Sequence, residues 1–317
     1  MSITLVIHGG AGNITPAMMT QEDEITYTRA LEDALERGYS ILEKGGSALN
    51  AVTEAVVSME DNPVFNAGKG SVFTKKGVHE MDAAIMEGKF LAAGAVAGVR
   101  NIRNPIKLAH EVMLHSGHVF LSGKGAAEFA LKQGIPFEPD EYFYNKLRYE
   151  QWVEIRDSDF TQLDHKGDNL KGGVQPYKFG TVGAVALDAQ GNVAAATSTG
   201  GMTNKRFGRI GDSPVIGAGT YANNQTCAIS CTGHGEYFLR AVAAYDVSCL
   251  MEYKGYSLQQ ACDTVIKEKL IRMGGEGGLI AVDSLGNHVF SFNSAGMFRG
   301  VQNHKGYKEV AFYGHNS

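Results

Sequence analysis

The sequence has little of what marks secreted, metal-stapled or membrane-spanning proteins. Its four cysteines, Cys227, Cys231, Cys249 and Cys262, form no C-x-x-C pair, which argues against a disulfide framework or a zinc knuckle. We therefore expect reduced, buried thiols. No window reaches the 18 uninterrupted apolar residues of a membrane helix, and the opening MSITLVIHGG lacks the basic and long apolar segments of a signal peptide. These absences predict a cytoplasmic protein without a membrane partner.

The sequence also has no large excess of positive or negative charge. The 29 basic and 34 acidic residues give a net charge of −5, and no run of Lys or Arg exceeds two residues. A nucleic-acid or anionic-membrane surface needs clustered basic residues, so neither partner is expected. Only 7 prolines among 317 residues, with 44% hydrophobic residues, exclude a disordered or collagen-like chain. We expect one globular domain over 1–317 with a small-molecule partner.

Apolar spacing indicates both helices and strands. Residues 3–7 predict a buried strand that ends in a flexible turn at the following HGGAG run. Short strands separated by glycine turns are expected over 71–101, and strands at 227–231, 278–282 and 289–292. A 3.6-residue periodicity predicts helices at 21–44, 47–61, 105–115, 123–133, 139–154, 236–253 and from Ser257 onward. This order predicts an α+β fold of stacked sheets with helices on their outer faces.

A hairpin is expected over 181–199. Two apolar runs, 181–187 and 193–199, flank the turn sequence Asp-Ala-Gln-Gly-Asn. If Gly191 closes a three-residue loop in the left-handed conformation, paired residue numbers sum to 380, and Thr181 lies opposite Thr199. The same turn pattern recurs at 283–287.

Two segments beside this hairpin carry unusual chemistry. Residues 155–180 have no apolar period, which predicts a linker that ends where Gly180 meets Thr181. After Thr199, a glycine-rich loop contains Arg209 and Asp212. A guanidinium suits a carboxylate, and a carboxylate suits an ammonium group, so the pair predicts binding of a free α-amino acid head.

The segments GTVGAVALD, TSTGGMTNKRFGRIGDSP, SCTGHGE, HGGAG and FNAGKG together resemble the plant-type L-asparaginases, also called isoaspartyl peptidases. These are threonine-type N-terminal nucleophile hydrolases, and the resemblance covers almost the whole chain. It implies a four-layer αββα sandwich, made as a precursor that cuts itself between Gly180 and Thr181. The products would be a large subunit, 1–180, with linker 155–180, and a small subunit, 181–317, assembled as a dimer of processed heterodimers.

The resemblance implies the following chemistry. The Thr181 hydroxyl attacks the Gly180 carbonyl, and the freed α-amino group of Thr181 then acts as a base for its own hydroxyl. The mature enzyme hydrolyses L-asparagine to aspartate and ammonia and cleaves β-aspartyl dipeptides through a Thr181 acyl-enzyme. Thr199 would orient Thr181, and the Thr232 hydroxyl with the Gly233 N–H would stabilise the oxyanion.

The remaining site residues follow from the same resemblance. Substrate contacts are expected from Asn66, Arg209, Ile210, Gly211, Asp212, Thr232, Gly233, His234 and Gly235. No organic cofactor is expected. A structural sodium ion is implied at the main-chain carbonyls of Met59, Glu60, Asn62, Phe65, Ala67 and Lys69. His234 and Lys69 are positions where this chain can differ from its relatives.

Two kinds of alternative remain open from the residues. One is another hydrolase on the same scaffold, either a glycosylasparaginase or a threonine endopeptidase; the amino-acid head clamp argues against the endopeptidase. The other is an uncleaved, non-catalytic protein whose glycine-rich loops and Arg209 hold a small carboxylate. The run at 122–125 lacks phosphate-loop spacing, and no H-E-x-x-H pair is present, so no nucleotide or catalytic metal is expected.

Overall fold

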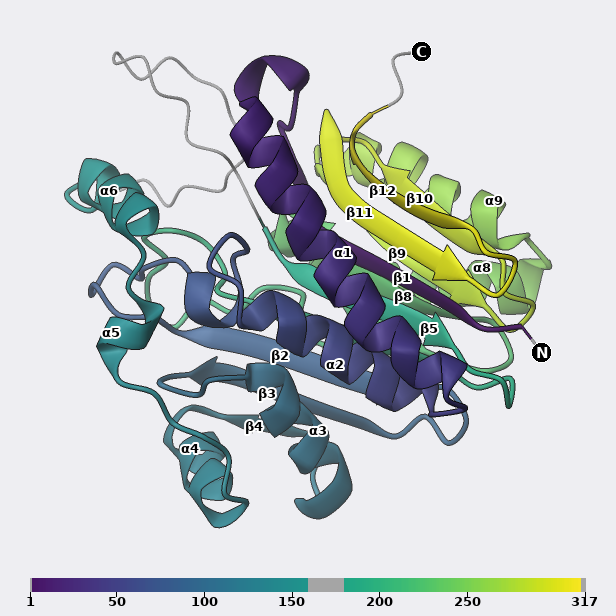
Figure 1. Cartoon of the computed structure of the whole chain (residues 1–317), viewed down its shortest axis with the longest axis horizontal. Coiled ribbons are helices and arrows are strands. Elements are labelled where there is room, and N and C mark those ends of the chain that lie inside the picture. The colour runs from purple at the N-terminus through teal and green to yellow at the C-terminus, as the bar shows by residue number, and fades with distance from the viewer. Residues whose placement is uncertain (1, 159–179, 315–317) are drawn as a thin grey trace.

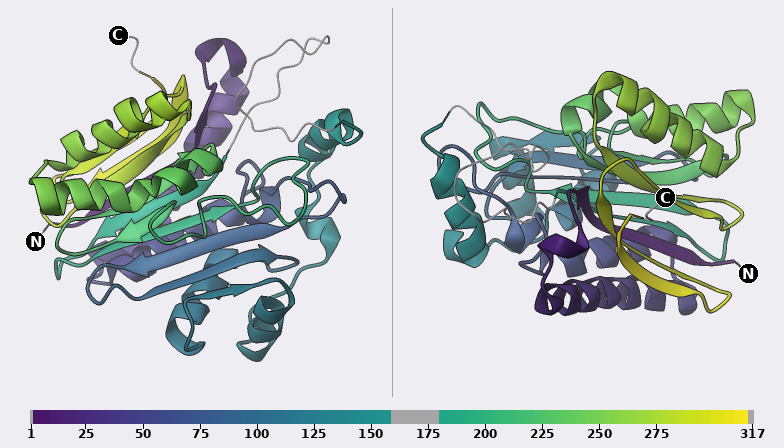
Figure 2. Two further views of the ribbon diagram at one scale, coloured as in Figure 1. Left: turned by 180° about the vertical axis from the view of Figure 1, so that it is seen from behind. Right: turned by 90° about the horizontal axis from the view of Figure 1, so that it is seen from above.

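Two β-sheets lie face to face, and helices cover both outer faces (Figure 1; Figure 2, right). The computed structural model describes residues 2–158 and 180–314. The large sheet has the order β12-β11-β1-β5-β6-β2-β3-β4, and the small sheet has the order β10-β9-β8-β7. This is the predicted αββα sandwich of the N-terminal nucleophile hydrolases. Part of the predicted linker, 159–179, lies outside the described residues.

The large sheet combines strands from both halves of the chain, whereas the small sheet is formed by the second half. The large sheet contains β1 (Thr4–Gly12), β2 (Met81–Glu87), β3 (Ala93–Val99), β4 (Phe120–Ser122), β5 (Val182–Leu187), β6 (Val193–Thr199), β11 (Gly296–Asn303) and β12 (Lys308–Tyr313). The small sheet contains β7 (Thr220–Ala222), β8 (Cys227–Gly233), β9 (Gly277–Asp283) and β10 (His288–Phe292). All residues of β5 and β6 are buried, because helices pack on one side of them and the small sheet on the other.

The helices form the two outer layers. The large sheet is covered by α1 (Gln21–Glu43), α2 (Ala48–Glu60) and α3 (Pro105–His115), with α4 (Gly123–Lys132), α5 (Asp140–Phe143) and α6 (Lys146–Ile155) beyond it. The small sheet is covered by α7 (Gly235–Ala241), α8 (Ala243–Lys254) and α9 (Leu258–Asp263), continued by a π-helical turn, Thr264–Leu270, and α10 (Ile271–Met273). None of these helices combines the length and apolar composition needed to cross a bilayer.

The hairpin β5–β6 has the predicted register. Val182 pairs with Ser198 and Leu187 with Val193, so paired numbers sum to 380. Gly191 has φ = 80°, and its N–H donates to the Asp188 carbonyl. The turn at 283–287 repeats this arrangement, with Gly286 at φ = 84°. In both turns the aspartate side chain accepts two backbone N–H groups, which explains why one sequence pattern gives one geometry.

The prediction that the first strand ends before the HGGAG run is wrong. Strand β1 continues to Gly12 and stays paired with β11, with a bulge between His8 and Gly10. A side chain is not tolerated here, because a Cβ on Gly9 would lie 2.5 Å from the Phe65 ring. The glycines therefore allow close packing of a strand rather than a turn.

Two long predicted helices are each divided. The predicted helix 139–154 is split into α5 and α6, and 236–253 is split into α7 and α8 at Val242, which has φ = 50°. A β-branched residue rarely adopts this conformation, so no local pattern predicted the break. Of the four cysteines, three are buried as expected, whereas Cys249 is partly exposed.

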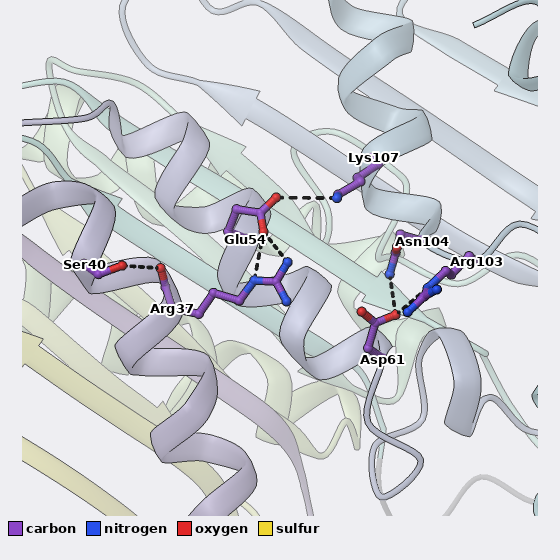
Figure 3. A network of polar contacts seen from close by, with 7 residues as sticks. All are labelled: Arg37, Ser40, Glu54, Asp61, Arg103, Asn104 and Lys107. Carbon is purple, nitrogen blue, oxygen red and sulfur yellow. Dashed lines mark hydrogen bonds and ion pairs between the residues drawn. The ribbon is translucent and has the colours of Figure 1, made fainter. Parts of the chain in front are cut away.

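Apolar side chains form two cores, one on each face of the large sheet. The first lies between this sheet and α1–α3, and the second lies between the two sheets and extends to α7–α9. Charged side chains connect the outer helices at the surface: Arg37 on α1 and Lys107 on α3 both contact Glu54 on α2 (Figure 3). Just after α2, Asp61 binds Arg103 and Asn104. Exposed ion pairs of this kind contribute little to the free energy of unfolding. The arrangement of the sheets and helices therefore depends mainly on the two apolar cores.

Candidate active site

The predicted nucleophile lies between the two sheets. Thr181 directly precedes β5 and is 6% exposed. Its backbone N–H donates to Thr232 Oγ1 at 3.4 Å, and Thr232 belongs to β8 of the opposite sheet. The predicted cleavage position is thus placed against a residue 51 positions later in the chain.

The hydroxyl of Thr181 contacts a residue that the sequence reasoning missed. Thr181 Oγ1 lies 3.3 Å from Ser213 Oγ. Thr199 is opposite Thr181 by register, but its Oγ1 accepts the Gly201 N–H at 2.9 Å. Within residues 2–158 and 180–314 there is no hydrogen bond between the Thr181 and Thr199 side chains. Ser213 directly follows Asp212 in the sequence, and this position next to a predicted substrate-binding residue could have indicated that Ser213 belongs to the site.

Thr232 and Gly233 are placed beside the predicted scissile bond. Thr232 Oγ1 accepts the N–H groups of both Thr181 and Ala11 at 3.4 Å. A Cβ on Gly180 would lie 3.1 Å from this oxygen. Since Thr232 Oγ1 accepts both bonds, its own proton is available to an incoming oxyanion. Gly233 has φ = 145°, and a Cβ there would lie 2.5 Å from the Glu276 carbonyl, so no other residue fits easily.

Arg209 is oriented by a second residue that sequence reasoning missed. Its Nε and Nη2 donate to the two carboxylate oxygens of Glu236 on α7, both at 2.9 Å. Partial burial raises the pKa of Glu236, but hydrogen bonds and charge from Arg209 lower it overall. Such a bidentate pair fixes the plane of the guanidinium. Glu236 directly follows the SCTGHG run in the sequence, but a glutamate at this position does not by itself indicate Arg209 as its partner.

Asp212, the other residue of the predicted clamp, lies beside Arg209. A Cβ on Gly235 would lie 2.8 Å from Asp212 Oδ1 and 2.9 Å from Arg209 Nη2, so both groups flank this glycine. Asp212 is 3% exposed, and its Oδ2 has no hydrogen-bond partner within the described ranges. Burial raises the pKa of Asp212 to about 7, against the opposing charge of Arg209. A buried carboxylate oxygen without a partner is suited to receive an ammonium group.

Asn66 connects two loops near Thr199. Its Nδ2 donates to the Gly201 carbonyl at 2.7 Å, and its Oδ1 accepts the Val72 N–H at 3.1 Å. Its backbone carbonyl also accepts the Gly200 N–H at 2.9 Å. A Cβ on Gly200 would lie 2.4 Å from Asn66 Oδ1. Asn66 therefore fixes the turn that follows β6.

A buried lysine supports the same turn. Lys205 is 2% exposed, and its Nζ donates to the carbonyls of Glu80 at 2.6 Å and Gly200 at 2.9 Å. Burial lowers the pKa of Lys205, whereas the charge of Asp82 raises it. Asp82 pairs with Thr199 across β2 and β6, so both charges lie near the end of the hairpin. Sequence reasoning missed both residues.

The remaining predicted contact residues surround the clamp. Gly211 packs against Arg209, since a Cβ there would lie 2.9 Å from Nη1, and Ile210 is 40% exposed. The His234 Nε2 lies 3.4 Å from Glu236 Oε2, and its ring packs edge-on against Tyr237. Lys69 lies farther out, with its Nζ over the Tyr142 ring.

Glycines of the loop predicted to hold sodium lie close to backbone carbonyls. A Cβ on Gly70 would lie 2.0 Å from the Phe65 carbonyl, and one on Gly68 would lie 2.4 Å from the Glu60 carbonyl. Three of the predicted carbonyls, those of Met59, Asn62 and Ala67, accept backbone N–H groups of the same loop. Backbone oxygens are ligands that hard cations accept, and the sodium ion stays a prediction here. Among the described side chains, no group of three or more His, Cys, Asp or Glu residues could hold a metal.

Comparison with known proteins gives consistent matches over nearly the whole chain. The family model described as asparaginase matches residues 1–312. A protein of Escherichia coli named isoaspartyl peptidase is 53% identical over 295 residues, which cover 93% of this chain and 91% of that protein. A human isoaspartyl peptidase/L-asparaginase is 43% identical, covering 94% and 92%. A probable isoaspartyl peptidase/L-asparaginase of Arabidopsis thaliana is 42% identical, covering 98% of each chain.

Proposed function

The chain belongs to the asparaginase family of hydrolases, and we propose that it is a self-processing threonine enzyme that acts on L-asparagine and on β-aspartyl dipeptides. The relatives named isoaspartyl peptidase or L-asparaginase support both activities. The observation that carries the proposal is the placement of Thr181: its hydroxyl faces Ser213, its backbone N–H faces Thr232, and the Arg209–Asp212 clamp belongs to the same loop as Ser213.

Processing creates the active terminus. Thr181 Oγ attacks the Gly180 carbonyl, the Gly180–Thr181 amide bond breaks, and an ester forms between the Gly180 acyl group and Oγ. The nitrogen of Thr181 takes up the hydroxyl proton and becomes a free amine. Water then hydrolyses the ester, which leaves a carboxylate on Gly180 and restores the Thr181 hydroxyl. Gly180 suits this step because it presents no side chain to the attacking oxygen.

Hydrolysis of substrate uses the same hydroxyl. The α-amine of Thr181 accepts the Oγ proton as Oγ attacks the side-chain carbonyl of asparagine, and the resulting oxyanion accepts hydrogen bonds from Thr232 Oγ1 and the Gly233 N–H. The proton passes to the leaving nitrogen, which departs as ammonia. Water, deprotonated by the same amine, hydrolyses the aspartyl ester and releases aspartate.

The clamp explains why both substrates fit. Arg209 binds the α-carboxylate and Asp212 binds the α-ammonium of the aspartyl head. L-Asparagine and β-aspartyl dipeptides share this head and differ only in the leaving amine. The clamp disfavours an endopeptidase, whose substrate has no free head at this position. A glycosylasparaginase shares the head and is separated by testing a glycosylated asparagine.

Denaturing electrophoresis with N-terminal sequencing tests the proposal. Wild-type protein is expected to give two fragments, one of which begins Thr-Val-Gly-Ala. Thr181→Ala removes the nucleophile and is expected to stay a single chain without activity, whereas Thr181→Ser keeps a hydroxyl and is expected to be cleaved. A wild-type chain that stays intact while binding aspartate would establish the non-catalytic alternative.

Three further features stay predictions alongside this function. They are the assembly of processed heterodimers into a dimer, the sodium ion at the 59–69 carbonyls and a cytoplasmic location. None of them takes part in a chemical step. The division into subunits 1–180 and 181–317 follows from the same cleavage and is tested by the same sequencing.

A further inference from the structure

Three buried hydroxyl residues connect His8 to Ser213 between the two sheets. His8 Nε2 lies 2.8 Å from Ser230 Oγ, which lies 2.7 Å from Thr197 Oγ1. Thr197 Oγ1 lies 2.7 Å from Thr220 Oγ1, which lies 3.0 Å from the Ser213 backbone carbonyl. Each of these side chains is at most 1% exposed. We call His8, Ser230, Thr197 and Thr220 the hydroxyl chain.

The contacts of Thr220 connect the hydroxyl chain to Ser213. A backbone carbonyl can only accept, so the bond between Thr220 and Ser213 uses the Thr220 proton. Thr220 Oγ1 is also the donor toward Thr197 Oγ1, and Thr197 Oγ1 donates to the Gly219 carbonyl at 3.4 Å. Thr220 therefore shares one proton between the Ser213 carbonyl and the rest of the hydroxyl chain.

His8 is a neutral imidazole at the buried end of the hydroxyl chain. Burial lowers the pKa of His8 to about 3, and a smaller effect, a hydrogen bond with the Thr181 backbone, raises it. A Cβ on Gly183 would lie 2.4 Å from His8 Nε2 and 2.0 Å from Ser230 Oγ, so β5 closes over this contact without free space.

We propose that Ser213 is a further catalytic residue, which holds the Thr181 hydroxyl in one rotamer, and that the hydroxyl chain positions Ser213 for this role. The inference rests on the proposed function, in which Thr181 is the nucleophile. Ser213 Oγ is 3.3 Å from Thr181 Oγ1, whereas Thr199 bonds Gly201. Threonine Oγ can occupy three staggered positions, and a fixed neighbour selects one of them. With Ser213 as donor, the Thr181 proton stays directed toward its own amine.

Paired substitutions at Thr220 separate positioning from packing. Thr220→Val keeps the volume but removes the hydroxyl that holds Ser213, and Thr220→Ser keeps the hydroxyl. Thr226→Val is the matched control, because Thr226 forms an equally buried 2.7 Å contact with Ser248 outside the hydroxyl chain. Losing a positioning hydrogen bond changes a rate by about tenfold.

The expected result is a difference in kcat. Thr220→Val should lower kcat by about tenfold with KM nearly unchanged, while Thr220→Ser and Thr226→Val keep the wild-type kcat. Thr220→Val and Thr226→Val should lose similar stability in urea unfolding. Equal kcat in Thr220→Val and Thr226→Val would overturn the proposal. An equal loss in Thr220→Ser would also overturn it, since the methyl group and not the hydroxyl would then be required.

A second measurement does not depend on activity. Long-range ¹H–¹⁵N correlation spectra of the full-length protein, labelled at histidine and assigned with His8→Gln, follow the ionisation of the ring. Because burial lowers the pKa of His8 to about 3, the expected state is a neutral ring at pH 5 in both wild-type protein and Thr181→Ala. A ring that becomes charged near pH 6.5 would contradict a buried hydroxyl chain and refute the inference. If wild-type protein neither cleaves itself nor hydrolyses substrate, the proposed function fails, and the titration of His8 still tests the hydroxyl chain.

Discussion

Replacement of Asp212 by asparagine tests the substrate clamp most directly. The carboxylate is buried, and its Oδ2 has no partner within the described residues. Burial raises the pKa of Asp212 from 3.8 to about 7, so the free enzyme holds this group half-protonated near neutral pH. A shift of this size corresponds to roughly 4 kcal/mol of lost stabilisation of the charged form. The ammonium group of the substrate would restore that stabilisation.

The sign of the pH dependence follows from this shift. Asp212 gains its charge only as the pH rises through about 7. Below that value, each pH unit lowers the charged fraction about tenfold, and binding of an ammonium group weakens by the same factor. Because the substrate ammonium stabilises the charge, the pKa of Asp212 in the complex lies lower. The effect therefore belongs to binding and not to kcat.

The inhibition constant of L-aspartate, the product of the proposed reaction, measures this binding from pH 5.5 to 8.5. An inhibitor is preferable to a substrate, because its binding does not require the Thr181 amine to act as a base. In wild-type enzyme the constant should rise about tenfold per pH unit below 7. In Asp212→Asn it should be higher at pH 8 by a factor of roughly 30 or more and nearly independent of pH.

Stability separates this result from structural damage. A raised pKa in the folded state means that the contribution of Asp212 to stability falls as the pH rises from about 4 to 7, because the unfolded chain releases its proton first. Other buried groups, such as Glu60 and His8, titrate in both proteins, so the difference in unfolding free energy between Asp212→Asn and wild type isolates this contribution. That difference should shift in favour of Asp212→Asn over this range and leave the variant at least as stable as wild type at pH 8. Asp246→Asn, which breaks a surface ion pair with Lys269, is the control and should leave inhibition unchanged. A wild-type inhibition constant that is flat between pH 5.5 and 7 would refute the assignment of Asp212.

Two further predictions concern the orientation of Arg209 and the packing around β5. Glu236→Gln removes the charge that orients Arg209, and since Glu236 is 45% exposed the KM for L-asparagine should rise only roughly two- to fivefold, with kcat unchanged in steady-state assays. An unchanged KM would show that Arg209 needs no orienting partner. Gly183→Ala places a Cβ 2.0 Å from Ser230 Oγ and should cost roughly 1–3 kcal/mol or more in urea unfolding. Gly125→Ala, in α4 with open space around it, should gain about 0.5–1 kcal/mol, and equal effects of the two substitutions would contradict the packing argument.

Local chemistry made much of the fold predictable. The register of β5 and β6 followed from one turn, because Gly191 and the Asp188 side chain fix the loop length and thereby every pair along the hairpin. The helix starts at Ser47 and Ser257 were likewise predicted from residues whose side chains cap the backbone within three positions. Such features depend on interactions between near neighbours, which a single sequence displays.

Features that depend on contacts between distant segments of the chain could not be predicted from local sequence patterns. Strands β11 and β12 were missed; in β11, Gly296, Arg299 and Gly300 interrupt the apolar pattern, and pairing with β1 stabilises the strand. Ser213 was missed because its contact with Thr181 requires the loop between β6 and β7 to lie between the sheets. Arg209 and Asp212 were predicted because their side chains suit a carboxylate and an ammonium group. Glu236 was not predicted, because its partner Arg209 lies 27 residues away in the sequence.

The distribution of polar groups between the sheets gives an independent argument for the site. Most of this layer is apolar, formed by side chains such as Val185, Ile229 and Leu279. Beside the start of β5 the layer instead contains the polar side chains of His8, Ser230, Thr197 and Thr220, which are all buried. Apolar side chains here would avoid the desolvation of these groups, and buried hydroxyls bonded to one another add little net stability. Because stability does not require this polar segment, its position beside Thr181 is best explained by what it orients.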